Sequence, residues 1–343
     1  MCSLKIRQVL VAALSMLSPL FCAAQEPAES SEVSYLSFQV PGAFETIPVG
    51  INDSNEVTGS YSNLTFNGVF AFVRSADGVI TTFSVSNSSR TAPVAINASG
   101  EIAGQYFNGQ TFEGFVRKAD GAITTFSPKA GDITYVTGIN ADRTIIGYFS
   151  GTNADSPVHG FVRLADGAII KFHVPGSTQT VPESINREGE ITGYYLKVEG
   201  TNEYAGFVRS CDGAITTFDV PGSIQIMPVT INARRIVVGT RTTSQLDDGF
   251  LRDADGAITT FNVPGAVVTL PVSMNARGIV VGSYTISIDP ALFSGFLRSK
   301  AGTFTLFDFP GGMATTPASI NASNVITGYY YNGHDVLGFL RLP

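Results

Sequence analysis

Seven arginines recur through this chain at intervals of about 45 residues, and each follows a phenylalanine by two positions. They are Arg74, Arg117, Arg163, Arg209, Arg252, Arg298 and Arg341. Guanidinium groups arranged in a ring would suit an anionic polymer. However, residues two apart in a strand share a face, and the phenylalanine is expected to pack between repeats. We therefore expect each arginine to bond a nearby carbonyl or a turn aspartate, in a structural role.

Seven asparagines recur with the same period. They are Asn52, Asn97, Asn140, Asn186, Asn232, Asn275 and Asn321. An asparagine that precedes a turn accepts hydrogen bonds from nearby backbone amides. A structural role is predicted for these residues too.

The segments that differ most between the repeats contain acidic, aromatic and imidazole side chains. The candidate ligand-binding residues there are Glu113, Asp155, His159, Glu203, Tyr204, Asp247, Asp248, Asp289, Tyr331, His334 and Asp335. Variable loops on a rigid scaffold commonly carry binding. Several carboxylates around one channel mouth would bind Ca²⁺ or a sugar, or act as acid and base. No individual catalytic residue is predicted.

The histidines do not indicate a metal site. His159 and His334 lie in variable segments, whereas His173 lies on a strand that is expected to be outermost in its repeat. This separation argues against a zinc cluster. No Gly-x-Ser-x-Gly elbow, EF-hand loop or phosphate-binding glycine loop stands out. No cofactor is predicted, and Ca²⁺ is the one metal kept open.

The repeat that contains these residues consists of four short strands rich in Val, Ile, Thr, Tyr and Phe. One copy has strands at 182–186, 191–195, 206–209 and 215–220. We call these strands a, b, c and d in chain order. A proline is expected at the first position of strand a in most copies, where no ladder hydrogen bond is lost.

Two kinds of turn join the strands. Asp-Gly joins strands c and d in five copies and supplies the positive φ angles of a tight hairpin. Asn-x-x-Gly or Asn-x-x-Asn joins strands a and b. Arg143 and Arg235 occupy the last position of that motif, which predicts strain or a different turn there.

The two ends of the repeat region are offset by one strand. It begins with a strand of type d at 35–40 and ends with a strand of type c at 338–341. The period predicts an all-β, seven-bladed β-propeller with four-stranded antiparallel blades over residues 35–343. The N-terminal strand d would join the C-terminal strands a to c and close the ring. An open solenoid or another number of blades is the alternative.

Composition and the N-terminus favour export. Residues 1–24 form a predicted signal peptide, with Lys5 and Arg7 before an apolar stretch and a cut near Ala24-Gln25. A lipoprotein cut before Cys22 is the competing interpretation. Residues 25–34 are expected to be a flexible leader. The predicted location is extracellular or periplasmic.

Charge and cysteine content restrict the partners. The formal net charge is −7 with no basic run, which argues against nucleic acid and anionic lipid. No segment after the leader could span a membrane. Cys211 alone would survive cleavage, so no intrachain disulfide is expected. The mature chain is predicted to be a monomer.

The repeat resembles a family of bacterial extracellular proteins. The unit Ile-Asn-x-x-Gly-x-Ile-x-Gly-Tyr, followed by Gly-Phe-Leu-Arg and Asp-Gly-x-Ile-Thr-Thr-Phe-x-Val-Pro-Gly, is similar to the HAF repeats over about residues 35 to 343. The name comes from a His-Ala-Phe segment, for which this chain has His159-Gly160-Phe161 or other variants. The resemblance implies architecture and export, and it brings no catalytic residues.

Three functional hypotheses follow. The first is a secreted, non-catalytic propeller that binds a ligand, protein or polysaccharide through its variable b–c loop face. The second is an extracellular glycosidase or lyase with carboxylates at the channel mouth. The third is a structural surface or matrix protein.

Overall fold

Short strands make up all the regular secondary structure of the described residues. The computed structural model describes residues 33–63, 68–244, 246–288 and 292–343. No helix occurs within these ranges, so none there is long and apolar enough to cross a membrane. The all-β prediction is confirmed.

The strands follow one another in groups of four. In chain order they are β1 (Ser34–Phe38), β2 (Ala43–Ile51), β3 (Val57–Asn63), β4 (Phe70–Arg74), β5 (Ile80–Phe83), β6 (Thr91–Ile96), β7 (Ile102–Phe107), β8 (Phe112–Arg117), β9 (Ile123–Phe126), β10 (Ile133–Ile139), β11 (Ile145–Ser150), β12 (Val158–Arg163), β13 (Ile169–Phe172), β14 (Thr180–Ile185), β15 (Ile191–Leu196), β16 (Tyr204–Arg209), β17 (Ile215–Phe218), β18 (Gln225–Ile231), β19 (Val237–Thr242), β20 (Asp247–Arg252), β21 (Ile258–Phe261), β22 (Val268–Met274), β23 (Val280–Thr285), β24 (Ser294–Arg298), β25 (Phe304–Phe307), β26 (Ala314–Ile320), β27 (Ile326–Tyr331) and β28 (Val336–Leu342). Each repeat is named below after its innermost strand, so β14 to β17 form the β14 repeat.

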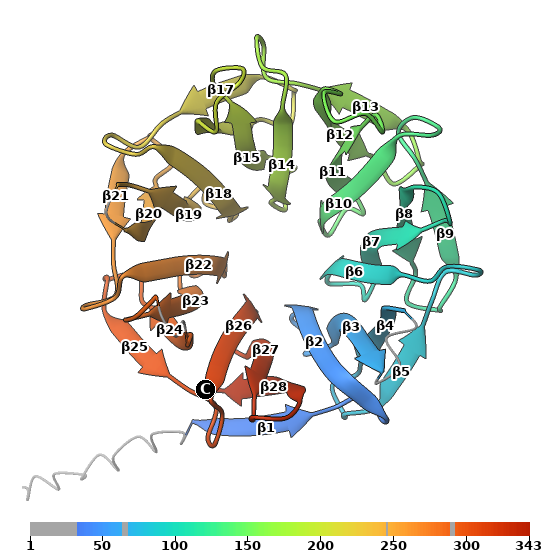
Figure 1. Ribbon diagram of the computed structural model, residues 1–343, viewed down its shortest axis with the longest axis vertical. Coiled ribbons are helices and arrows are strands. Elements are labelled where there is room, and N and C mark those ends of the chain that lie inside the picture. The colour runs from blue at the N-terminus through green and yellow to red at the C-terminus, as the bar shows by residue number, and fades with distance from the viewer. Residues whose placement is uncertain (1–32, 64–67, 245, 289–291) are drawn as a thin grey trace, which may run out of the picture. The chain divides into compact units, whose positions relative to one another are not determined.

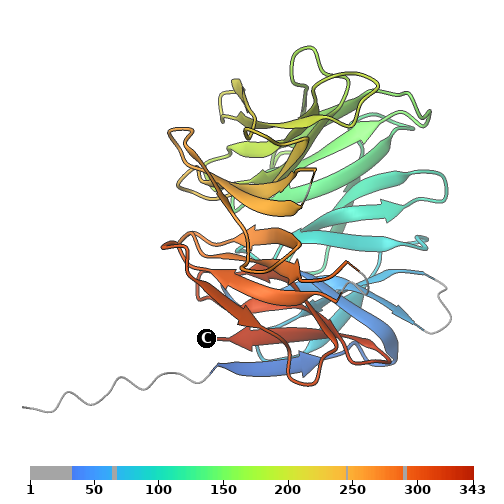
Figure 2. The same cartoon turned by 60° about the vertical axis from the view of Figure 1, so that its left-hand side comes forward.

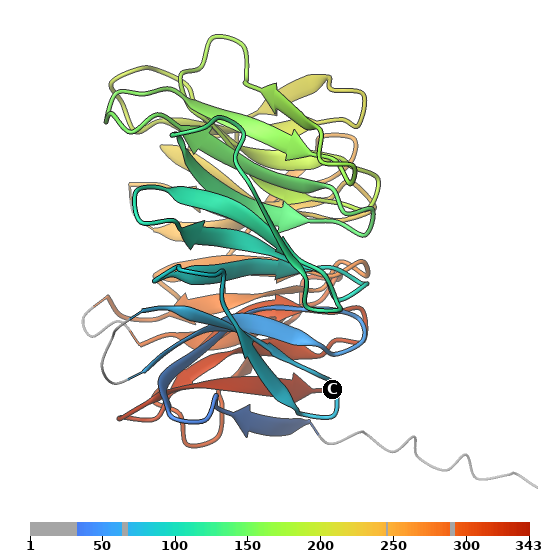
Figure 3. The same cartoon turned by 90° about the vertical axis from the view of Figure 1, so that its right-hand side faces the viewer.

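Within each repeat, sequential strands pair antiparallel from the inside outward (Figure 1). In the β14 repeat, β14 pairs β15, β15 pairs β16 and β16 pairs β17. Neighbouring repeats pack face against face, as Figures 2 and 3 show from two sides. The innermost strands β2, β6, β10, β14, β18, β22 and β26 contact one another in this order, and β26 contacts β2. The predicted four-stranded antiparallel sheets are confirmed.

The proline of strand a lies inside the strand and not at its start. Pro182 is the third residue of β14 and pairs with Gly193, and the ladder register shifts between Pro182 and Ser184. Strand a has no further strand on its inner side, so the missing proline N–H leaves no ladder bond unmade. The expected first-strand position is therefore wrong, and the proline instead precedes a bulge that displaces one residue.

The a–b turns keep one geometry in spite of their different residues. The fourth residue has a positive φ at Gly189 (81°), Arg143 (63°) and Arg235 (62°) alike. The alternative of a different turn at the two arginines is thus wrong. At the c–d turns only the glycine has a positive φ, as at Gly213 (97°), which indicates a bulged hairpin turn rather than one with two left-handed residues.

Several of these turns also reach the preceding repeat. Arg143 Nε lies 3.0 Å from Glu101 Oε2, and Arg235 Nη2 lies 2.5 Å from Glu190 Oε1. The turn residues Asn55 and Asn324 use amide oxygens instead, and accept hydrogen bonds from Asn321 Nδ2 (2.8 Å) and Asn275 Nδ2 (2.9 Å) respectively. Each contact joins a turn to the asparagine or glutamate of the repeat before it.

The phenylalanine of strand c forms the core between sheets. These side chains are fully buried, and they are Phe72, Phe115, Phe161, Phe207, Phe250, Phe296 and Phe339. Each lies beside a glycine of strand b. A Cβ added at Gly193, for example, would collide with the Val181 carbonyl of strand a. The recurring Gly therefore lets strands a, b and c lie close to the aromatic layer.

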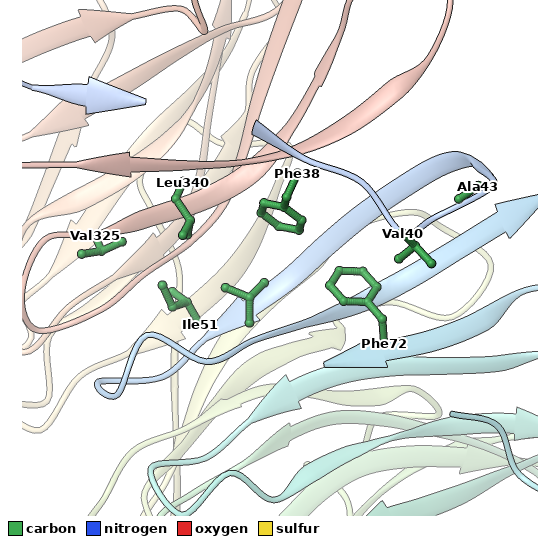
Figure 4. Close-up of a cluster of buried hydrophobic side chains, with 8 residues drawn as sticks. Phe38, Val40, Ala43, Ile51, Phe72, Val325 and Leu340 are labelled. Carbon is green, nitrogen blue, oxygen red and sulfur yellow. The ribbon is translucent and has the colours of Figure 1, made fainter. Parts of the chain in front are cut away.

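The first and last strands are paired with each other. β1 pairs antiparallel with β28 from Ser34↔Leu342 to Phe38↔Gly338. Phe38 packs in one buried cluster with Leu340 of β28 and with Ile51 and Phe72 of the β2 repeat (Figure 4). Burial of a phenylalanine contributes about 2 kcal/mol, so this cluster holds the two ends of the repeat region together.

Candidate functional site

The innermost strands surround a central cavity of about 210 Å³. Every repeat contributes the residue displaced by its strand-a bulge, and these residues are Val49, Val94, Thr137, Glu183, Val229, Val272 and Ala318. The wall around them consists largely of backbone, small side chains and aliphatic groups, such as Gly138, Ser184 and Ile185. Six of the seven positions thus carry uncharged side chains and one carries a carboxyl group.

Glu183 is the only titratable residue among the described residues that line this cavity. Burial raises the pKa of its carboxyl group to about 7, because the charged form loses water. In the described part of the chain this group forms no hydrogen bond or ion pair. The charge of Glu183 also acts on two nearby phenols. Burial and, to a lesser extent, this charge raise the pKa of Tyr148 to about 12, and they also raise the pKa of Tyr194.

Thr137, at the matching position of the adjacent β10 repeat, is the other bulge residue with a polar side chain. Its Oγ1 is buried and has no hydrogen-bond partner. A buried hydroxyl without a partner is uncommon and costs about 1–3 kcal/mol. The cavity therefore holds an unpaired acid and an unpaired hydroxyl on neighbouring strands.

A second cavity, the His159 groove, lies between a b–c loop and a d–a connector of the β10 repeat. It has a volume of about 320 Å³, and its walls include Lys129, Asp132, Phe149, His159 and Lys171. Lys129 Nζ lies 3.3 Å from Asp132 Oδ1, and Lys171 Nζ lies 5.1 Å from the centre of the Phe149 ring. Burial and the nearby His173 and Lys171 lower the pKa of His159, which favours a neutral imidazole at neutral pH.

A third cavity, the Asp155 groove, adjoins the second and extends onto the β14 repeat. It has a volume of about 520 Å³ and shares Ser156 and Pro157 with the His159 groove. Its other walls bring carboxylates, amides and hydroxyls together, from residues such as Asp155, Gln179 and Glu199. The two grooves form one polar surface that crosses from one repeat to the next.

Tyr204 contacts Gln179, a residue that lines the Asp155 groove. Its hydroxyl donates a hydrogen bond of 3.2 Å to Gln179 Oε1. Its neighbour Glu203 lies 3.8 Å from Lys197 Nζ. Glu203 and Tyr204, both predicted as ligand-binding residues, therefore lie on the β14 repeat, onto which the groove extends.

The remaining candidates lie outside both grooves. Glu113, on the β6 repeat, accepts hydrogen bonds from Tyr106 Oη (2.6 Å) and Asn108 Nδ2 (3.0 Å). On the β18 repeat, Asp248 forms a forked pair with Arg241, with N–O distances of 2.5 and 2.8 Å. Asp247 begins β20 beside it and bridges to Val268.

A further group belongs to the β26 repeat. His334 Nδ1 lies 2.8 Å from Asp335 Oδ1, and Tyr331 nearby is exposed. Asp289 lies outside the described residues. The structure therefore brings Asp155 and His159 to adjoining grooves, with Glu203 and Tyr204 close by, and places the other described candidates on other repeats.

The seven recurring arginines stack on aromatic rings. Each guanidinium carbon lies 4.8 to 5.2 Å from the centre of a strand-d phenylalanine ring of the preceding repeat. Six of them also donate a hydrogen bond to the carbonyl of the next residue, as Arg209 does to Ser210. In all seven the Nε atom is buried. Cation–π contacts between repeats thus hold these side chains.

The recurring asparagines link neighbouring repeats by hydrogen bonds. Asn186 Oδ1 accepts a hydrogen bond from the backbone N–H of Glu190, and Asn186 Nδ2 donates to the carbonyl of Asn232 in the next repeat. Six of the seven asparagines make this inter-repeat bond, at 3.1 to 3.3 Å, including Asn321 to Asn52. Asn232 points its amide to Met274 Sδ instead. An asparagine before a turn predicts only the local hydrogen bonds, so the sequence does not reveal the bond between repeats.

Metal and thiol chemistry find little support in the described residues. Among them no group of three or more His, Cys, Asp or Glu side chains is placed to hold a metal ion. Cys211 is a free, exposed cysteine in a c–d turn. Ca²⁺ binding at a channel mouth stays a prediction.

Glu183, Lys129 and Lys171 were not among the residues predicted from the sequence. A signal for Glu183 existed, because the residue after the strand-a proline is Val or Ala in the five other repeats with that proline. The two lysines differ from their counterparts, but only the fold shows that they line one cavity with His159.

Comparison with known proteins bears on the architecture. No family model matches the chain, and no curated protein matches it. Among solved structures, virginiamycin B lyase from Staphylococcus aureus is similar, with a TM-score of 0.61 and 16% identity over 91% of this chain and 100% of that one. The fold is that of a β-propeller.

Two further solved structures have a similar fold. Puromycin hydrolase has a TM-score of 0.62 and 13% identity over 86% of this chain and 52% of that one. The β-propeller domain of the Trilobed protease from Pyrococcus furiosus has a TM-score of 0.60 and 9% identity over 89% of this chain and 94% of that one. Such low identities establish the fold alone.

Proposed function

We propose that this protein is an exported, seven-bladed β-propeller that binds a polar ligand, without catalysis, in the paired His159 and Asp155 grooves. The observation that carries the proposal is the junction of two cavities, of about 320 and 520 Å³, on adjacent repeats. Cavities of this size are typical of ligand sites. The strand pairing of β1 with β28 and the circular contacts of the inner strands support a closed ring.

The groove chemistry favours an extended ligand with hydroxyl or amide groups. Lys129 and Lys171 supply cations at one end, and Asp155 and Glu199 supply carboxylates at the other. Gln179 and Asn202 add amides that both donate and accept hydrogen bonds. An oligosaccharide or a peptide segment offers complementary groups along its length.

The enzymatic alternative, a glycosidase or lyase that uses carboxylates at the channel mouth, has less support. A glycosidase mechanism of the common type needs two carboxyl groups that face one substrate. Glu183 supplies one to the central cavity, and the described lining residues add no second. Similarity to a lyase and a hydrolase extends only to the fold.

The proposal is tested by a thermal-shift screen with oligosaccharides, peptides, polyanions and divalent metals. A ligand that occupies the grooves should raise the melting temperature of the wild type and lose its effect in Glu199→Ala and Asn202→Ala, both of which are exposed. Arg187→Ala, on the opposite turn face, is the matched control and should respond like the wild type. A ligand effect that survives both groove substitutions would refute binding there.

Export and family membership are separate proposals. We infer that cleavage near Ala24-Gln25 releases a chain with HAF-type repeats to the periplasm or the medium. Mass measurement of the protein recovered from a bacterial host's periplasm or medium should give an N-terminus at Gln25. An uncleaved N-terminus, or retention in the cytoplasm, would contradict this.

A further inference from the structure

The central cavity carries features that the groove proposal does not use. Its seven bulge positions are equivalent in the fold, and four of them carry valine: Val49, Val94, Val229 and Val272. Among the seven bulge residues, only Glu183 brings a carboxyl group to the central cavity. Glu183 is half-buried, and a carboxylate withdrawn from water is normally stabilised by a bonded partner.

Glu183 does not have one. No arginine, lysine or histidine lines the cavity within the described residues, and the carboxyl group forms no ion pair there. The inter-repeat ion pairs of the a–b turns instead involve Glu101 and Glu190, which meet Arg143 and Arg235. The chain thus pairs two glutamates near the turns and leaves the one in the cavity unpaired.

We propose that the central cavity is a binding site for a compact alkylammonium group, which the Glu183 carboxylate holds as its counter-ion. Backbone and hydroxyl groups supply much of the wall, and the valine side chains at the bulge positions would contact the alkyl part of the ligand. Thr137 Oγ1 would accept a second N–H of the ammonium after rotation about its Cα–Cβ bond, which would satisfy a hydroxyl that now has no partner.

The size and the ligand set favour this cation over others. A cavity of about 210 Å³ has room for a few non-hydrogen atoms, since one water occupies about 30 Å³ in the liquid. A divalent metal such as Ca²⁺ takes six to eight oxygen ligands, and the wall offers one carboxyl group and scattered hydroxyls. One ammonium needs only one counter-ion and one or two acceptors.

Proton linkage follows from the same geometry. The groups that bear on the carboxyl group are the phenols of Tyr148 and Tyr194, each of which has a raised pKa and stays neutral near pH 7. Because the pKa of Glu183 is about 7 without a ligand, the acid is mostly ionised at pH 8.5. At pH 5 about 1% is ionised, so affinity for a cation should fall by about 100-fold.

The test uses n-butylammonium chloride as the probe and isothermal titration calorimetry on the whole protein. The wild type should bind the probe at pH 8.5, and Glu183→Gln should weaken binding by about tenfold or more. Neutral n-butanol should not distinguish the wild type from this variant. Glu188→Gln, an exposed glutamate in the turn after β14, is the matched control and should bind like the wild type.

A second variant guards against misfolding. Glu183→Val introduces the side chain that four other repeats carry, so it should fold and lose the probe. Absence of binding by the wild type at pH 8.5 would overturn the proposal. So would binding that Glu183→Gln leaves intact or that Glu188→Gln abolishes, because either result would place the ammonium away from the cavity carboxylate.

Discussion

Replacement of Glu183 by glutamine should stabilise the protein at alkaline pH and leave it unchanged in acid. Folding raises the pKa of this carboxyl group from 4.5 to about 7, because burial removes water from the charged form. Between these two pH values the folded state holds a proton that the unfolded state has lost. Stability of the wild type therefore falls as pH rises from about 4.5 to 7, and the loss is complete above pH 7.

The magnitude follows from the pKa difference. One pKa unit corresponds to about 1.4 kcal/mol, so the buried charge costs about 3 kcal/mol at pH 8. The unfolding entropy of a body of this length is about 0.65 kcal/mol/K. Glu183→Gln should therefore melt about 5 °C above the wild type at pH 8 and within about 1 °C of it at pH 4.

The assay is a series of melting curves between pH 4 and 9 for the wild type and the variant, without amines in the buffer. Glu188→Gln is the control, because this exposed glutamate lies in the turn after β14 and should give parallel curves. Equal melting temperatures of the wild type and Glu183→Gln throughout would refute the claim that burial destabilises the ionised acid. A variant less stable at pH 8 would mean that the carboxylate has a partner.

Two further predictions concern contacts between strands and repeats. Arg241→Ala should lower the unfolding free energy by about 3 kcal/mol in urea titrations at pH 7, because it leaves the nearly buried Asp248 without its forked partner. The double variant Arg241→Ala with Asp248→Ala should recover part of this loss. An unchanged urea midpoint in the single variant would contradict this account. Deletion of residues 34–38 should lower the unfolding free energy by at least about 3 kcal/mol and promote aggregation, because it removes Phe38 from its cluster and exposes the edge of β28. Calorimetry and light scattering would detect both effects, and a truncated protein that melts like the wild type would contradict a closed ring.

Most of the architecture could be predicted because it depends on repeated local signals. The phenylalanine and glycine positions of strands b and c specify a four-stranded sheet, and both recur in each copy. The arrangement of strand a was harder to predict, because a proline within a strand reads as a strand start. The bulge after Pro182 arises from ladder geometry on an inner edge, which a single sequence does not display.

The candidate site was less predictable than the fold for a related reason. Asp155, in a b–c loop, and His159, near the start of β12, were predicted because their segments vary between copies. Their spatial neighbours Lys129 and Gln179 belong to connectors between strands d and a, and only the ring geometry brings these segments together. Glu183 was not predicted because it lies in a strand. The bulge there decides on which face of the sheet a side chain lies, and the sequence does not reveal the bulge.

The contacts between a–b turns make the copies non-interchangeable. Arg143 and Arg235 each pair with a glutamate of the preceding copy, whereas Asn55 and Asn324 each contact an asparagine amide there, which every copy supplies. A gene rearrangement that removed one copy, or an intermediate that joined the wrong neighbours, would set an arginine against an amide or leave a glutamate alone. The two arginine–glutamate pairs therefore favour one order of the repeats that carry them, because a changed order would break both contacts.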